Sequence, residues 1–132
     1  MDVIDRGHVS AWIEGYERAW RTAGTEPLAA LFTDDATYSM EPYGVPARGL
    51  AAVADLWERE RVGPDEGFTM TYEVVAVDRD IGVARLEVHY LDKPATFRDL
   101  WIMRFAADGR CRAFEEWPYW PGKFDEWTQG ET

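Results

Sequence analysis

The pattern of apolar and polar positions changes once along the chain, close to residue 67. Before this point apolar residues recur at spacings of three and four, over about 9–23 and 50–61, and this spacing predicts amphipathic helices. After it apolar and polar residues alternate, which predicts strands at about 68–77, 83–91, 96–105 and 110–117. Short polar turns separate these strands, as in an antiparallel meander. Helices therefore precede sheet, and the predicted class is α+β.

The segment 31–49 joins the two patterns. A short helix that Thr25 can cap ends near Phe32, and a short strand is expected over 36–40 before prolines and glycines break it. Glu41 follows this strand and has the aromatic residues Tyr38 and Tyr43 near it. Turns held by rigid elements often carry reactive groups, so we predict that part of a pocket is built here.

Length and composition indicate one globular domain. The 132 residues suffice for one hydrophobic core, expected over about 9–120, with an acidic tail over about 124–132. Hydrophobic residues make up 46% and aromatic residues 14% of the chain, including seven Trp. So many rings can fill a core, line a cavity or cover a subunit interface.

Charge and cysteine content exclude several classes of function. The formal net charge is −11, and no Lys/Arg cluster is present that could neutralise phosphates, so nucleic acid is a poor candidate partner. No apolar run is long enough for a membrane span, and the first residues lack a signal-peptide pattern. The single Cys111 is expected in the core of a protein from a reducing compartment, so we expect a cytoplasmic location.

Four segments carry a resemblance to a known family. They are YERAW at 16–20, LFTDDATY at 31–38, RGLAAV at 48–53 and LWIMRFAADGRC at 100–111. In this order they resemble the nuclear transport factor two-like superfamily, and more narrowly its SnoaL-like members, over about 9–120. The resemblance implies a cone in which a curved antiparallel sheet wraps around three N-terminal helices and encloses a deep apolar pocket. It also implies an apolar small-molecule ligand, chemistry without a cofactor and a homodimer formed through the sheet.

Ketosteroid isomerase-like members of that superfamily suggest one set of catalytic residues. Glu41-Pro42 resembles their acid-proline corner, and Tyr16 lies where their oxyanion-binding tyrosine would be. By this resemblance Glu41 would take a proton next to a carbonyl group while Tyr16 stabilises the enolate. Trp101 stands where these proteins have a protonated acid, and its indole N–H can donate a hydrogen bond.

Limonene epoxide hydrolase-like members suggest a second set. Arg85 and Glu87 resemble their arginine-x-acid pattern, and Glu116 and Tyr38 fall at their second acid and tyrosine. One acid would then orient a water and the other would protonate an epoxide oxygen. Because side chains alternate along a strand, Arg85 and Glu87 share one face, but the same alternation describes any half-exposed strand. Met40 departs from the pattern, since an amide is expected there.

Asp99 is a further candidate, because its face of the predicted strand 96–105 is otherwise apolar. A buried carboxylate must be paired, protonated or directed into a wet cavity, and Arg85 or His89 on the neighbouring strand could be its partner. Two histidines without an acid or cysteine at ligand spacing make a metal site improbable. The residues expected to contact a ligand are Trp20, Tyr38, Met40, Tyr43, Trp57, His89, Trp101 and Met103.

Two hypotheses about function remain open at this stage. An acid-base enzyme acting on an apolar metabolite, as an isomerase, lyase, cyclase or epoxide hydrolase, predicts that several candidate acids converge on one cavity. These acids are Glu41, Glu87, Asp99 and Glu116. A non-catalytic binding or dimerisation module predicts instead that each pocket acid is held in an ion pair, with Arg85, Arg98, Arg104 or Arg112 as the available partners.

Overall fold

The computed structural model describes residues 3–61, 67–92 and 96–125. It contains three helices, α1 (Arg6–Trp20), α2 (Leu28–Leu31) and α3 (Leu50–Glu60). The strands are β1 (Phe32–Ser39), β2 (Ala47–Arg48), β3 (Phe68–Asp78), β4 (Ile81–Tyr90), β5 (Thr96–Phe105) and β6 (Cys111–Tyr119). The predicted α+β class is confirmed, and most element boundaries lie within three residues of those expected from the apolar pattern.

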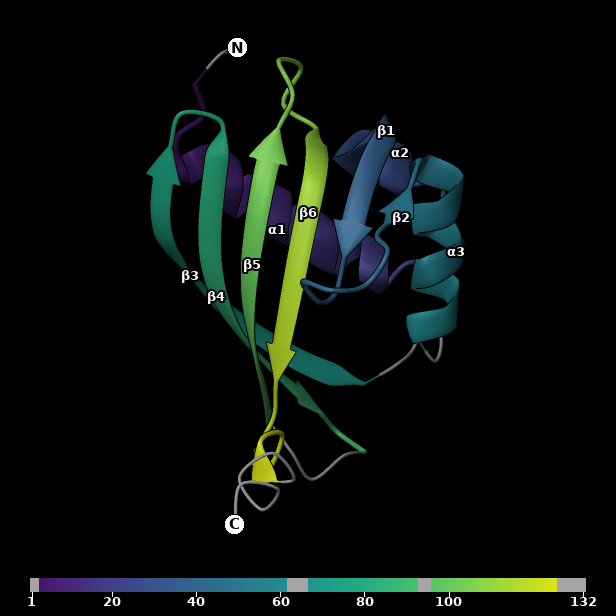
Figure 1. Ribbon diagram of the computed structural model, residues 1–132, viewed down its shortest axis with the longest axis vertical. Helices are drawn as coiled ribbons and strands as arrows, with labels where there is room; N and C mark the ends of the chain where they lie inside the picture. Colours follow the sequence, from purple (N-terminus) through teal and green to yellow (C-terminus); the bar gives the residue numbers. More distant parts are fainter. Residues whose placement is uncertain (1–2, 62–66, 93–95, 126–132) are drawn as a thin grey trace.

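One curved sheet holds all six strands, in the order β2-β1-β6-β5-β4-β3 (Figure 1). Strands β3 to β6 form the predicted antiparallel meander. The sheet is nevertheless mixed, because β1 lies parallel to β6 and antiparallel to the short β2. The expected antiparallel pairing holds for β3 to β6, and the β1–β6 pair adds a parallel pairing that the sequence analysis did not predict. Parallel partners need a long connection, and here it consists of β2, α3 and the rest of the meander.

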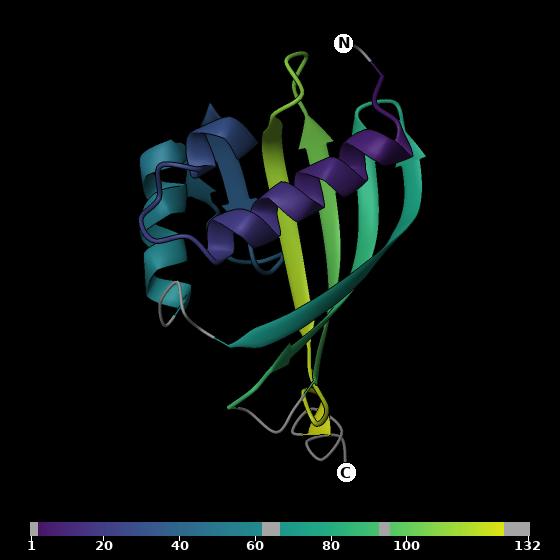
Figure 2. The same ribbon diagram turned by 180° about the vertical axis from the view of Figure 1, so that it is seen from behind.

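Helix α1 crosses the concave face of the sheet diagonally (Figure 2). Its buried residues are Val9, Trp12, Ile13, Tyr16 and Ala19, at the predicted helical spacing. The helix begins at Arg6 rather than Val9 because the Asp5 side chain caps it, accepting a 2.8 Å hydrogen bond from the His8 backbone N–H. Gly82 of β4 allows the close approach, since a Cβ at that position would lie 2.7 Å from a methyl group of Val9.

The C-terminal end of α1 is held by Arg61, which follows α3 and is only 7% exposed. Its guanidinium donates to the carbonyl oxygens of Ala19, Trp20, Thr22 and Gly24 at 2.8–3.2 Å. The carbonyls of a helix end lack the usual partners within the helix, and here only that of Ala19 also accepts a backbone hydrogen bond, from the Thr22 N–H, among the bonds of the described residues. Arg61 therefore fixes the helix end that carries Trp20.

Strand alternation decides which side chains face the helices. On β5 the buried, inward residues are Asp99, Trp101, Met103 and Phe105, and on β6 Phe114 is fully buried. Trp101 lies opposite Glu116 in the β5–β6 register, so Glu116 points inward too. Cys111 is fully buried, as predicted, and burial raises the pKa of its thiol to about 12. Within the described ranges, no helix combines the length and the apolar character needed to cross a membrane.

Candidate active site

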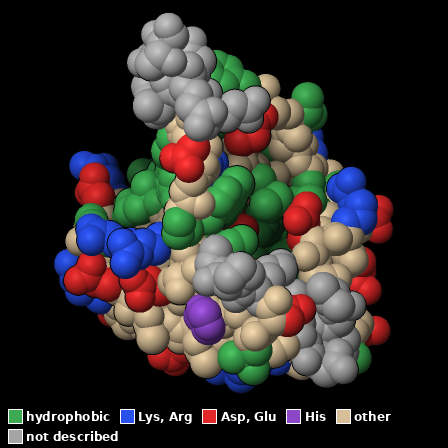
Figure 3. Space-filling view, turned by 90° about the horizontal axis from the view of Figure 1, so that it is seen from below, with side chains coloured by type: hydrophobic (Ala, Val, Ile, Leu, Met, Phe, Trp, Pro, Cys, Tyr) green, Lys and Arg blue, Asp and Glu red, His purple; other side chains and the backbone are tan. Residues whose placement is uncertain are grey.

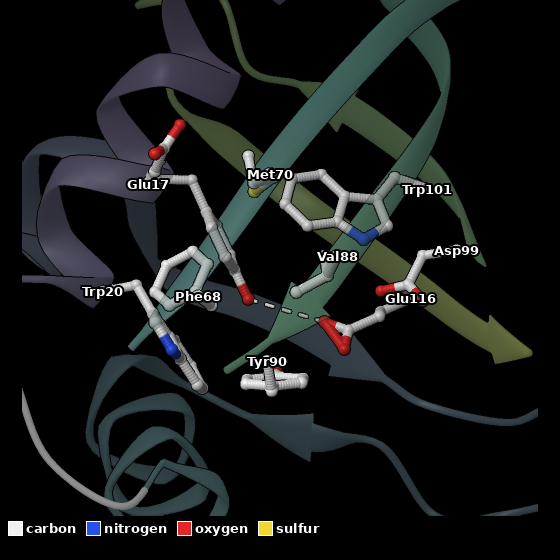
Figure 4. A pocket seen from close by; sticks show the side chains of 10 residues that line it. Glu17, Trp20, Phe68, Met70, Val88, Tyr90, Asp99, Trp101 and Glu116 are labelled. Carbon is white, nitrogen blue, oxygen red and sulfur yellow. Dashed lines mark hydrogen bonds between the residues drawn. The ribbon is translucent and has the colours of Figure 1, made fainter. Parts of the chain in front are cut away.

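A small inner cavity of about 50 Å³ lies between α1 and the concave face of the sheet. Figure 4 shows its side chains converging from α1 and from the strands. Its lining residues are Tyr16, Glu17, Trp20, Phe68, Met70, Val88, Tyr90, Asp99, Trp101 and Glu116. Most of this lining is apolar, and the two carboxyl groups of Asp99 and Glu116 lie next to each other within it (Figure 4).

A larger outer cavity of about 230 Å³ adjoins the inner one and shares four lining residues with it. The shared residues are Trp20, Tyr90, Asp99 and Glu116. The outer cavity is also lined by Tyr38, Met40, Leu56, Trp57, Glu60, Phe97, Pro118 and Trp120. Seen from below, hydrophobic side chains gather in a hollow of the surface (Figure 3). The two compartments together form a mostly apolar pocket with Asp99 and Glu116 where they meet, and an apolar lining with few polar groups is the usual character of a small-molecule site.

Asp99 is the more isolated of the two pocket acids. It is 8% exposed, and its Oδ1 has no hydrogen-bond partner among the described residues. Burial raises its pKa to about 6, an effect that the nearby indole N–H of Trp101 and the charge of Lys123 partly offset. At neutral pH the Asp99 carboxyl is therefore mostly ionised and has an oxygen available to accept a proton.

Glu116 is held by two tyrosines. Its Oε1 accepts a 2.7 Å hydrogen bond from the Tyr38 hydroxyl and a longer one of 3.4 Å from Tyr16. Burial first, and the negative charge of Asp99 second, raise the pKa of Glu116 to about 7, while the Tyr38 hydrogen bond lowers it. Glu116 is therefore protonated in part of the molecules near neutral pH, when Asp99 carries the charge.

Tyr16 and Tyr38 complete the polar cluster. Their hydroxyl oxygens are 2.9 Å apart, and either can donate to the other. Burial and the nearby Glu116 raise both phenol pKa values well above the usual range, so both hydroxyls keep their protons. Two indole N–H groups also lie at these cavities. That of Trp57 has no acceptor among the described residues, and that of Trp101 lies near the Asp99 carboxyl, whose pKa it lowers.

Asp99 and Glu116 have no ion-pair partners among the described residues, whereas Glu17, which also lines the inner cavity, pairs with Arg21 at 2.9 Å. The arginines of the sheet pair elsewhere: Arg98 with Glu87 at 3.0 Å, and Arg85 with Glu73 at 4.0 Å. The prediction that Arg85 or His89 pairs with Asp99 was wrong, because Arg85 and His89 lie on the opposite, exposed face of β4. The alternation predicted that Arg85 and Glu87 share a face, and they do, but neither lines the pocket.

Three further candidates also lie away from the pocket. Glu41 and Tyr43 are exposed, Tyr43 to 95%, because the chain leaves the sheet after Ser39 and turns into solvent. Glu41 lines a separate surface depression of about 310 Å³ together with Met40, which also reaches the outer cavity. Met103 points inward but is fully buried in the core. The expectation that Glu41, Tyr43 and Met103 contact the pocket was wrong.

Comparison with known proteins decides the family. The family model described as a SnoaL-like domain matches residues 12–114, most of the chain. The chain belongs to the SnoaL-like family. A comparison with curated proteins found no match.

Solved structures resemble this SnoaL-like domain at low sequence identity. A steroid delta-isomerase from Pseudomonas aeruginosa has 16% identity and a TM-score of 0.64, with 89% of this chain and 83% of that chain covered. A proposed polyketide cyclase from Sinorhizobium meliloti has 20% identity and a TM-score of 0.63, covering 80% and 93%. A de novo designed protein with a curved β-sheet reaches a TM-score of 0.68 at 14% identity, covering 96% of each chain. At such identity the likeness shows the fold, and a designed protein among the matches underlines that fold alone does not assign chemistry.

Several pocket residues of the SnoaL-like domain escaped the sequence analysis. Phe68 and Met70 of β3, and Val88 and Tyr90 of β4, are among them. Their alternation placed each pair on one face, but only the sheet's curvature brings that face toward α1. Leu56, Glu60, Phe97, Pro118 and Trp120 of the outer cavity were missed as well. Within the described segments, no three His, Cys, Asp or Glu side chains cluster as ligands for a metal ion.

Proposed function

We propose that this SnoaL-like protein is a cofactor-independent enzyme of the isomerase or cyclase type that moves a proton next to the carbonyl group of an apolar metabolite. One observation carries the proposal. Asp99 and Glu116 share one apolar pocket, burial raises the pKa of each toward neutrality, and neither has an ion-pair partner among the described residues. Such perturbed acids in a cleft are typical of catalytic sites.

Asp99 is assigned the role of general base. Its Oδ1 has no hydrogen-bond donor within the described part of the chain, and a carboxylate with a pKa of about 6 is ionised at neutral pH yet more basic than an ordinary aspartate. It would take a proton from a carbon adjacent to the ligand carbonyl. The electron pair of that C–H bond forms a carbon–carbon double bond, and the carbonyl π pair moves onto oxygen to give an enolate. Where the ligand has a second carbon–carbon double bond conjugated with the enolate, return of the proton to the far carbon of that bond completes an isomerisation. Attack of the enolate carbon on a second carbonyl of the ligand forms a carbon–carbon bond and an alkoxide, and return of the proton to that oxygen completes a cyclisation.

Glu116 is assigned the opposite role. With a pKa of about 7 and a neighbour that carries the negative charge, it is the acid that keeps its proton. A protonated carboxyl can donate to the developing enolate oxygen, and Tyr16 and Tyr38 hold this side chain in place. Because their surroundings give the two residues different pKa values, Asp99 can act as the base while Glu116 acts as the acid.

The alternatives have less support. A binding module was expected to lock its pocket acids in ion pairs. Glu17 is paired with Arg21, but the ion pairs of Arg85, Arg98 and Arg112 involve acids other than Asp99 and Glu116. Epoxide opening through Arg85 and Glu87 requires both at the pocket, and they lie on the outer face of the sheet. Proton abstraction by Glu41 has the same difficulty, because its side chain is exposed.

The proposal is tested with small bicyclic ketones, of which 2-tetralone is the simplest, incubated with the protein in heavy water. Exchange of the protons next to the carbonyl is followed by NMR. The proposal predicts exchange above the buffer rate, and removal of the base by Asp99→Asn should lower the protein-dependent rate by about 10²- to 10⁴-fold. Asp55→Asn, a substitution on the exposed face of α3, is the matched control and should exchange like the wild type. Exchange at the buffer rate for every ketone, or full activity of Asp99→Asn, contradicts the proposal.

We further propose that the protein forms a homodimer through the outer face of the sheet, as the family resemblance implies. The described part of this face carries the Arg85–Glu73 and Glu87–Arg98 pairs and the partly exposed Val75. A solution mass equal to one chain at micromolar concentration would refute the dimer.

A further inference from the structure

The surface depression beside the loop 40–46 borders the outer cavity. This loop leaves the end of β1 and returns to β2 beside α3 (Figure 1). The depression measures about 310 Å³, and its apolar lining residues are Tyr38, Met40, Val45, Pro46, Ala47 and Leu56. It therefore offers a hydrophobic surface that the chemistry at Asp99 and Glu116 does not use.

Shared lining residues place three spaces in a row. The inner and outer cavities have four residues in common, with Asp99 and Glu116 among them. The outer cavity and the depression share three others, which are Tyr38, Met40 and Leu56. Among the described residues, none lines both the inner cavity and the depression. A molecule that has its reacting end at the two acids and extends through the outer cavity therefore reaches the depression next.

The border between the outer cavity and the depression suits a slender group. Tyr38 is 4% exposed and is held by its hydrogen bond to Glu116, whereas Met40 and Leu56 are only half-buried. A methionine side chain has three rotatable bonds and adapts to different neighbours. A flexible chain can therefore pass beside Met40 after a change of its rotamer, without movement of Tyr38.

The far side of the depression is open to water. Val45 is 97% exposed although it lines the depression, and the lining residues Glu41 and Arg59 are exposed as well. The opposite charges of Glu41 and Arg59 give no preference for an ionic group of either sign. A bound apolar chain would cover Val45 and remove apolar surface from water, which favours binding.

A second depression is a weaker candidate for the same role. It measures about 420 Å³ and is lined by Thr96, Arg98, Tyr119, Trp120, Pro121 and Phe124. Within the described part of the chain, Trp120 alone lines both this depression and the outer cavity. The depression beside the loop 40–46 is joined to the outer cavity through three residues, so it is the better continuation of the pocket.

We infer that the depression beside the loop 40–46 is the distal part of the ligand site and binds a flexible alkyl chain of the molecule that occupies the pocket. The ligand is then an elongated compound, with a compact apolar body in the outer cavity and a chain that passes Met40 and Leu56 to reach Val45. That this ligand is the substrate rests on the proposed function, whereas the binding of its chain does not.

The test compares 2-tetralone with its 6-methoxy, 6-butoxy and 6-octyloxy derivatives. Affinity should rise about threefold for each added methylene group while the chain lies in the depression, and should level off once its end reaches water. The methyl signals of Val45 in NMR spectra should move with the octyloxy compound and stay in place with 2-tetralone. Loss of these signals in Val45→Asp identifies them.

A charge at the depression separates a specific chain site from general hydrophobic binding. In Val45→Asp, the ratio of the octyloxy affinity to the 2-tetralone affinity should be at least about fivefold lower than in the wild type, because the carboxylate would lose water next to the chain. Val3→Asp is the matched control, since Val3 is 63% exposed and lines none of the three spaces, and it should leave this ratio unchanged.

Two results overturn the inference. One is an affinity that does not grow with chain length or that falls equally in both variants. The other is a chain that moves the ring signals of Phe124 and leaves those of Val45 in place, because it would then occupy the second depression. Chain-dependent binding at Val45 without proton exchange in any of the four ketones would instead refute the proposed function alone.

Discussion

The Tyr38 hydroxyl donates a 2.7 Å hydrogen bond to Oε1 of Glu116, across the parallel pair of strands β1 and β6. The two residues are far apart in the sequence, and the register that places Tyr38 beside Phe114 brings its hydroxyl to the carboxyl group. This bond ties the helical half of the chain to the last strand at the pocket. It also lowers the pKa of Glu116, against the larger effects of burial and of the Asp99 charge, which raise it.

Removal of this bond should raise the pKa of Glu116. A hydrogen bond to the carboxylate favours the charged form, so Tyr38→Phe is expected to move the pKa upward from about 7. Carboxyl titration by NMR measures the shift. Tyr72→Phe is the matched control, because the Tyr72 hydroxyl donates a bond of the same length to Glu14 outside the pocket. An unchanged Glu116 titration in Tyr38→Phe would show that the hydroxyl does not stabilise the carboxylate.

Glu116 should make the folded protein less stable as pH rises. Its pKa is raised on folding from 4.5 to about 7, so the folded chain holds a proton that the unfolded chain releases. This contribution is fully present below the unfolded pKa and is lost as pH rises through about 7. Between about pH 5.5 and about pH 8 the loss amounts to roughly 2 kcal/mol. Urea unfolding of wild type and Glu116→Gln at both pH values measures it: the variant, which cannot ionise, should lose less stability. Parallel losses in both proteins would contradict this sign.

The rate of proton exchange should have an optimum near pH 6.5. The base must be ionised and the acid protonated. The rate should therefore decrease when the pH drops below the Asp99 pKa of about 6, and again when the pH rises above the Glu116 pKa of about 7. Glu116→Gln should lower the rate and remove the fall at high pH, since a glutamine amide cannot lose its proton in this range. A rate that rises steadily to high pH in the wild type would count against Glu116 as the acid.

Arg61 should be needed for stability because its buried guanidinium donates to four carbonyl groups at and beyond the end of α1. A lysine ammonium has three donors and a different geometry, so Arg61→Lys should cost about 2 to 4 kcal/mol of unfolding free energy. Arg59→Lys, at an exposed position of α3, is the control and should change stability by less than about 0.5 kcal/mol. Equal stability of both variants would show that the buried guanidinium is dispensable.

The sequence predicted the fold well where periodicity governs it. The strand expected at 96–105 is β5 with the same bounds. Its large apolar residues alternate, so only one assignment of its two faces to the core and to the outside fits the pattern. The parallel pairing of β1 with β6 was missed, because nothing in the residues near 32–39 reports a partner about eighty positions away. The short β2 at Ala47 and Arg48 was missed as well. It forms by pairing with the other side of β1, and its two residues are too few to show a periodicity.

The candidate site was predicted only in part. Asp99 stood out because an acid on an apolar strand face is costly, and Glu116 entered through the family resemblance; both line the pocket. Arg85 and Glu87 fitted a family pattern, but their alternation with buried Leu86 assigns them to the outer face. Glu41 could be a solvated loop acid or a buried pocket base, and its exposure in the structure indicates the first. The local sequence does not determine the path of the loop after Ser39, so it could not predict this exposure.

The most direct test of the account is a titration of the side-chain carboxyl groups, followed by carbon-13 NMR in the absence of ligand. Asp99→Asn and Glu116→Gln identify the two signals. The account predicts that Asp99 titrates near pH 6 and Glu116 near pH 7, and that Asp99→Asn lowers the pKa of Glu116 by removing a neighbouring negative charge. If both carboxyl groups titrate near pH 4, like ordinary exposed acids, the pocket holds no base or acid suited to neutral pH, and the proposed chemistry is wrong.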